Sequence, residues 1–79
     1  MIAPEQVQSH IEKGLQCTRV RVLGDGQHFE ALVVSEAFRG KSRVERHQLV
    51  YAALGDRMRE EIHALSMRTL TPEEVAADG

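Results

Sequence analysis

The spacing of apolar residues changes several times along the chain, and each change predicts a new element. Apolar residues at every fourth position predict a helix over residues 4–16: Val7, Ile11 and Leu15. Residues 17–23 alternate between polar and apolar side chains, which is typical of a strand with one face in water. Residues 28–35 are more continuously apolar, so they predict a second and more central strand. The glycine-rich polar residues 24–27 predict the turn between the two strands.

A capping pattern marks the start of a second helix. Ser42 is a good N-cap, and Glu45 three residues later completes a capping box. The helix is expected to run to Leu54 and to end at Gly55. The apolar stripe of this helix is expected to contain four residues: Val44, Val50, Tyr51 and Leu54.

The last third of the chain predicts one more strand and one more helix. Charged residues 56–61 fit an additional helical turn, and residues 62–69 predict a third strand. Thr71 caps a short last helix, with Pro72 at its first position and Glu74 at its third. The resulting order, α-β-β-α-β-α, predicts an α+β sandwich in which helices cover a three-stranded mixed sheet.

Length and composition narrow the class of protein. With 79 residues, of which 42% are hydrophobic, the chain is expected to form one small domain over residues 1–79. One cysteine excludes an internal disulfide and fits a reducing compartment. We find no secretory signal and no apolar run near the roughly 20 residues that span a bilayer, so we expect a cytoplasmic location and no membrane partner. A net charge of −2 gives no general reason to expect nucleic acid.

Two histidines are expected to meet at one end of the sheet. His28 begins the second predicted strand, and His63 lies at the beginning of the third. A strand, helix and strand in one sheet form a crossover, which joins parallel strands, so both side chains emerge at the same end. The pattern leaves two interpretations open: ordinary residues at strand ends, or a pair of nitrogen ligands. Asp25, in the turn before His28, is a possible extra ligand.

The remaining candidate residues favour structural roles. His47 falls inside the expected apolar stripe and is predicted to be partly buried, whereas His10 is predicted to be a surface or packing residue. Cys17 is predicted to be a small core residue. The chain has no nucleophile–base motif, no phosphate-binding glycine loop and no H-E-x-x-H spacing, so we do not expect an enzyme. A closed zinc or iron–sulfur site needs four ligands, so the inventory favours a half-site that another protein completes.

Three motifs together resemble the BolA family, and most closely its IbaG-like branch. They are GDGQHF at residues 24–29, FRGKSRV at residues 38–44 and IHALSMRTLTP at residues 62–72. The resemblance covers nearly the whole chain, from the first predicted helix through TPEE. It implies the same α-β-β-α-β-α sandwich, which in that family is related to class II KH domains.

The resemblance also implies a partner and a cofactor. Members of the family pair with monothiol glutaredoxins of the C-G-F-S type and share a [2Fe–2S] cluster with them. The glutaredoxin cysteine and a glutathione thiolate supply sulfur ligands, and the family's ligand positions correspond here to His63 and His28. The implied function is an adaptor in cluster trafficking, maturation or iron sensing, which binds no cluster tightly alone.

A DNA-binding transcriptional regulator is the alternative. A KH-like surface would use four basic residues: Arg39, Lys41, Arg43 and Arg46. Many members of the family have R-H-R in the second helix, but here Gln48 replaces the second basic residue. The chain also lacks the G-x-x-G signature of KH domains and has few aromatic residues for stacking. The same basic residues could instead be a solvated helix start or dock an acidic surface of a glutaredoxin.

Overall fold

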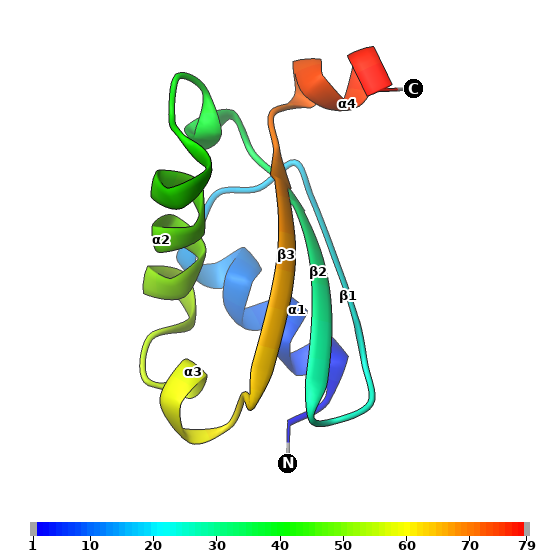
Figure 1. Ribbon diagram of the computed structural model, residues 1–79, viewed down its shortest axis with the longest axis vertical. Coiled ribbons are helices and arrows are strands. Elements are labelled where there is room, and N and C mark those ends of the chain that lie inside the picture. Colours follow the sequence, from blue (N-terminus) through cyan, green and yellow to red (C-terminus); the bar gives the residue numbers. More distant parts are fainter. Residues whose placement is uncertain (1, 79) are drawn as a thin grey trace.

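The chain folds in the predicted order, with one additional 3₁₀ turn (Figure 1). The computed structural model describes residues 2–78. The elements are α1 (Pro4–Gly14), β1 (Arg19–Gly24), β2 (His28–Val34), the 3₁₀ turn η1 (Glu36–Phe38), α2 (Arg43–Leu54), α3 (Arg57–Glu60), β3 (Ala64–Leu70) and α4 (Pro72–Asp78). The predicted α+β class is therefore confirmed, and α3 is the helical turn expected within residues 56–61.

The three strands form one mixed sheet in the order β1-β2-β3. β1 pairs with β2 antiparallel, and β2 pairs with β3 parallel. The prediction that the more apolar second strand is central is confirmed. The parallel register places His28 opposite Ala64, at the start of both strands.

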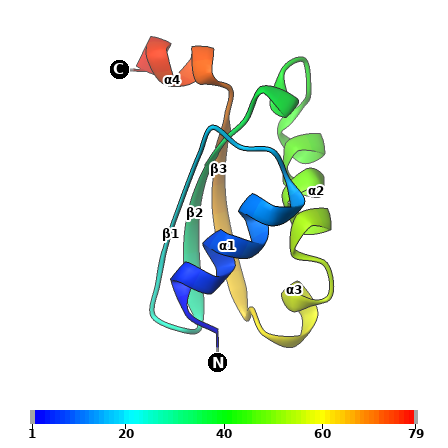
Figure 2. The ribbon, with the colours of Figure 1, turned by 180° about the vertical axis from the view of Figure 1, so that it is seen from behind.

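The helices α1 and α2 lie on the same face of the sheet (Figures 1 and 2). They cross closely near Gly14, where an added Cβ would lie 2.8 Å from the Cα atom of Ala53. The other face of the sheet is open along most of its length. The side chains at the outward positions of β1 are accordingly exposed. The short helix α4 lies at the end of the sheet where β3 ends (Figure 1).

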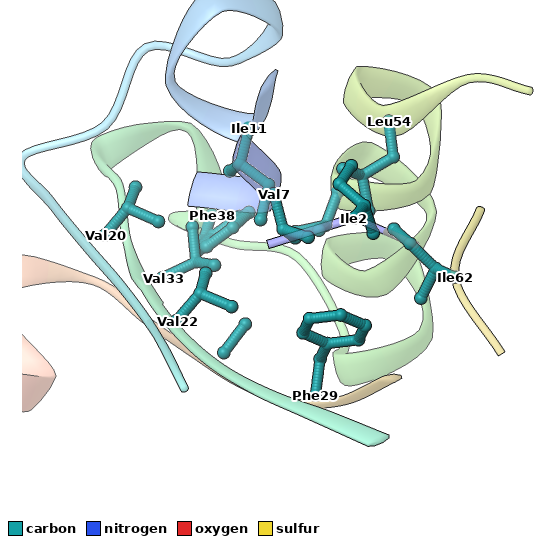
Figure 3. Packing of buried hydrophobic residues seen from close by; sticks show 12 residues of the cluster. Ile2, Val7, Ile11, Val20, Val22, Phe29, Val33, Phe38, Leu54 and Ile62 are labelled. Carbon is teal, nitrogen blue, oxygen red and sulfur yellow. The ribbon is translucent and has the colours of Figure 1, made fainter. Parts of the chain in front are cut away.

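The hydrophobic core fills the space between the sheet and the two helices (Figure 3). Val7 and Ile11 of α1 are fully buried, which confirms the predicted stripe of the first helix. From the sheet, Phe29 and Val33 point into the same cluster. Ile62, just before β3, closes the cluster at the end that holds His28 and His63.

The predicted stripe of α2 is wrong at two of its four positions. Val50 and Leu54 are fully buried, but Val44 is 66% exposed and Tyr51 is 41% exposed. The buried side of α2 instead follows a spacing of four that begins at Arg46, whose side chain is only 13% exposed. An arginine can occupy this position because its guanidinium finds polar partners at the rim of the core.

The ends of the elements depend on local capping. The Ser42 hydroxyl accepts a hydrogen bond from the Glu45 amide, and the Glu45 carboxylate accepts one from the Ser42 amide, as predicted. Gly55 ends α2 at a φ of 61°, a conformation that favours glycine. The first helix ends two residues earlier than predicted, and β3 begins two residues later. Within residues 2–78, none of the helices has the length and apolar character needed to span a bilayer.

Candidate metal centre

The structure brings His28 and His63 together at one end of the sheet. Their ring centres lie 6.0 Å apart, with the rings nearly perpendicular at 83°. Both residues are exposed. His28 is the first residue of β2, whereas His63 lies one residue before β3. The predicted strand, residues 62–69, had included His63. The predicted convergence of the two side chains is confirmed.

The backbone on both sides of the pair is anchored. The Ala64 amide donates to the Gln27 carbonyl at 3.1 Å, which joins the residues that flank the two histidines. Ile62 is only 4% exposed, and its amide donates to the Arg57 carbonyl at 3.0 Å. His63 therefore lies between a buried residue and the first residue of a strand.

Asp25 holds the turn that precedes His28. Its Oδ1 atom accepts hydrogen bonds from the amides of Gln27 and His28, each at 2.9 Å. These two hydrogen bonds hold the pKa of the Asp25 carboxyl below its ordinary value, and the amide of His28 has the larger effect. Asp25 was a possible extra ligand, but within residues 2–78 no three His, Cys, Asp or Glu side chains gather at a metal-binding spacing. The structure thus gives Asp25 a role in the turn, because one of its oxygens already accepts two amides.

Gly24 lies in close contact with the two residues that follow the turn. An added Cβ at this position would lie 2.5 Å from Cδ1 of Phe29 and 2.7 Å from the His28 carbonyl oxygen. The sequence indicated only a turn glycine, and this requirement for close approach was missed. The G-D-G spacing before a histidine and an aromatic residue is the signal that could have indicated it.

The donor set fits part of a metal site. Metal–imidazole bonds are about 2 Å long, so the ring centres of two imidazoles on one metal ion lie on the order of 5–6 Å apart. The 6.0 Å separation of His28 and His63 is close to that range, and both side chains are exposed. Iron–sulfur clusters accept two histidines on a single iron, as in Rieske centres, while thiolates hold the other iron. The pair could therefore supply nitrogen ligands, with sulfur ligands from another molecule.

Two of the four candidate basic residues are engaged by carboxylates. Arg39 forms ion pairs with Glu36 and Glu73. Arg46 pairs with Glu74 at 2.7 Å and also donates to the carbonyls of Lys41 and Thr69.

The remaining two basic residues are exposed. Lys41 and Arg43 lie beside a hollow between α2 and β3, which Arg46 and His47 also line. The four residues thus gather near the start of α2, but their positive charge is partly neutralised. Their role in docking DNA or a protein partner stays a prediction.

The other histidines and the cysteine have the environments that the sequence indicated. His47 and His10 are half-buried, and burial lowers the pKa of His47. Cys17 packs against the core, and its Sγ–H donates to the Leu15 carbonyl at 3.2 Å. Burial raises the pKa of this thiol, so the thiolate is disfavoured.

The fold defines a small α+β module with two exposed histidines side by side at one end of its sheet. A family model described as BolA-like protein matches residues 5–74. The chain belongs to the BolA-like family, as the sequence motifs indicated.

Relatives and solved structures agree with this assignment. The chain is 40% identical to acid stress protein IbaG of Escherichia coli over 74 residues, which is 92% of this chain and 88% of that protein. It is 39% identical over 51 residues, 65% of this chain and 50% of the relative, to the DNA-binding transcriptional regulator BolA of Haemophilus influenzae. A BolA homologue from Coxiella burnetii has the same fold, with a TM-score of 0.89, 45% identity and coverage of 96% of this chain and 99% of that one.

Proposed function

We propose that this protein is an adaptor that pairs with a monothiol glutaredoxin of the C-G-F-S type and shares a [2Fe–2S] cluster with it. His28 and His63 would supply nitrogen ligands, and the glutaredoxin cysteine and glutathione would supply sulfur. The single observation that carries the proposal is the 6.0 Å approach of two exposed imidazoles at one end of the sheet. The complex would serve cluster trafficking, maturation or iron sensing.

The chemistry of the ligands supports this role. Neutral imidazole in place of a thiolate makes the cluster less negative and raises its reduction potential. Two nitrogen ligands alone are too few to close an iron–sulfur site, so the cluster would depend on both proteins. A shared and exposed cluster is suited to transfer, because separating the two proteins removes ligands.

The test compares variants of the two histidines. Wild type, His63→Ala and His28→Ala are titrated into cluster-loaded glutaredoxin with glutathione, and visible circular dichroism is recorded. We expect His63→Ala to abolish the spectrum of the mixed complex and leave only the signal of the glutaredoxin homodimer. We expect His28→Ala to keep a mixed complex with a shifted spectrum and faster cluster loss. Water, or the Asp25 oxygen that does not accept the two turn amides, can replace the missing ligand.

A matched control separates ligation from general effects of removing an imidazole. His10→Ala removes a half-buried histidine from α1, in a different element from the pair, and should leave the spectrum unchanged. Thermal melts should show that His28→Ala and His63→Ala remain folded, since both histidines are exposed, and the same melts check that the His10→Ala control is folded. A folded His63→Ala protein with the wild-type spectrum and cluster lifetime would show that His63 is not a ligand.

DNA binding is the second candidate function. It is supported by the name of the Haemophilus influenzae relative and by exposed Lys41 and Arg43 beside the hollow between α2 and β3. A regulator that uses these residues should bind duplex DNA with an affinity that falls steeply with salt. Lys41→Ala or Arg43→Ala should each reduce the slope of log K against log salt concentration by about 1. An adaptor should bind duplex DNA only in the nonspecific range, with a Kd on the order of 10⁻⁴–10⁻⁶ M at physiological salt.

A further inference from the structure

The open face of the sheet carries an apolar centre between charged side chains. Leu23 on β1 is 54% exposed, and Leu32 on β2 is half-buried beside it. A hollow of about 380 Å³ on this face is lined by residues of all three strands, among them Arg21, Leu23, Glu30, Leu32, Ser66 and Arg68. Exposed apolar residues that gather beside arginines are typical of surfaces that bind another protein.

This surface continues into the histidine end of the sheet. A second hollow, of about 290 Å³, is lined by His28 and Asp25 together with other residues at that end. The two hollows share Leu23, Glu30 and Ser66. A molecule that covers the open face would therefore also reach His28.

The charge of the face indicates what kind of molecule could cover it. The whole chain has a net charge of −2, but this face carries more arginine than carboxylate. Within the part of the chain that the structure describes, Arg19 and Arg21 take part in no ion pair. A second copy of the chain would place like charges together, whereas an acidic partner would place carboxylates opposite the two guanidinium groups.

We propose that the open face is the docking surface for the protein that completes the metal centre, an inference that rests on the proposed function. The matching surface has an apolar side chain that packs against Leu23 and Leu32, surrounded by carboxylates that face Arg19 and Arg21. Docking there places the partner's sulfur ligands beside His28. The face thus recognises the partner, and the histidines bind what the partner carries.

The test measures partner binding separately from cluster formation. The C-G-F-S glutaredoxin with glutathione, iron-free and then cluster-loaded, is titrated by calorimetry with wild type, Leu23→Asp and Arg21→Glu. Each of the two variants should raise the Kd about tenfold or more, since each introduces a negative charge that faces an acidic partner. Two matched controls alter other surfaces: Tyr51→Asp, at an exposed apolar residue of α2, and Lys13→Glu on α1. These controls should change the Kd by less than about twofold.

The outcomes distinguish this inference from the proposed function. If Leu23→Asp and Arg21→Glu bind like wild type while a mixed cluster still forms, the docking surface is wrong and the proposed function stands. If the iron-free partner binds through the face but no mixed cluster forms, the docking surface stands and the proposed function is wrong. If wild type binds neither the iron-free nor the cluster-loaded glutaredoxin, both the docking surface and the proposed function are wrong. A wild-type dimer that Leu23→Asp dissociates in sedimentation experiments would assign the face to a second copy and overturn the inference.

Discussion

Gly24 shows how one residue without a side chain positions His28. An added Cβ would meet both the Phe29 ring and the His28 carbonyl oxygen, and the latter belongs to the backbone and cannot rotate away. Asp25 then fixes the amide of His28 from within the turn. The position of the His28 backbone thus depends on its two neighbours in the turn, Gly24 and Asp25.

We predict that Gly24→Ala lowers the free energy of unfolding by about 1–3 kcal/mol, because the methyl group overpacks the contact with Phe29. Chemical denaturation measures this change. In a double-mutant cycle with Phe29→Leu, the two losses should be less than additive, since the second change removes part of the clash. Unchanged stability in Gly24→Ala would show that the turn adjusts freely.

At the scale of elements, α2 separates what the sequence predicts well from what it does not. Its two ends were predicted correctly because the Ser42–Glu45 capping box and Gly55 act within one turn of the chain. The prediction of its buried face was wrong at Val44 and Tyr51. Hydrophobicity alone cannot show that Arg46 turns inward to the Thr69 carbonyl and to Glu74. Such contacts join distant segments and leave no local pattern.

The same distinction applies to the candidate site. The histidine pair could be predicted because a crossover between strands requires parallel pairing, which places both strand starts at one end. The turn role of Asp25 and the packing of Gly24 could not, since both depend on distances across the hairpin. The open, positively charged sheet face was also missed, although the exposed arginines of β1 were expected to face water.

The corrected face of α2 leads to a test of stability. Leu54→Ala should lower the free energy of unfolding by about 2–5 kcal/mol, because Leu54 is fully buried in the core. Val44→Ala removes an apolar side chain of the predicted stripe but should change stability by less than about 0.5 kcal/mol, since Val44 is exposed. Urea denaturation of both variants measures the difference. Equal decreases in the free energy of unfolding for the two variants would show that Val44 belongs to the buried face, as the sequence predicted.

At the scale of the whole molecule, ion pairs attach α4 to the rest of the fold. Arg46 of α2 binds Glu74 through two hydrogen bonds, at 2.7 and 3.3 Å. Arg39, after η1, binds Glu73 next to it. The Arg46 guanidinium, together with the Thr71 amide, lowers the pKa of the Glu74 carboxyl from 4.5 to about 2. The last helix is therefore held through a carboxylate that stays charged in mild acid.

This attachment predicts a defined dependence on pH. Because the pKa of Glu74 is lowered in the folded state, its stabilisation is complete above the ordinary value of 4.5 and is lost as the pH falls through about 2. We expect Glu74→Gln to be less stable than wild type by a constant amount above pH 5 and by a shrinking amount at lower pH. Denaturation at several pH values measures the difference, with Glu73→Gln as the control on an exposed pair. A difference that is the same near pH 2 and pH 7 would contradict the assignment.

The parallel pairing of β2 with β3 also determines when during folding the histidine pair comes into existence. The hairpin of β1 and β2 closes over a short turn, whereas β3 joins only after the chain has passed through α2 and α3. Closing such a long loop is slower than closing a hairpin. The two imidazoles lie on opposite sides of that loop, so a nascent or partly folded chain presents them separately. The pair of adjacent imidazoles thus arises only together with the completed sheet, and an unfinished chain presents each histidine alone.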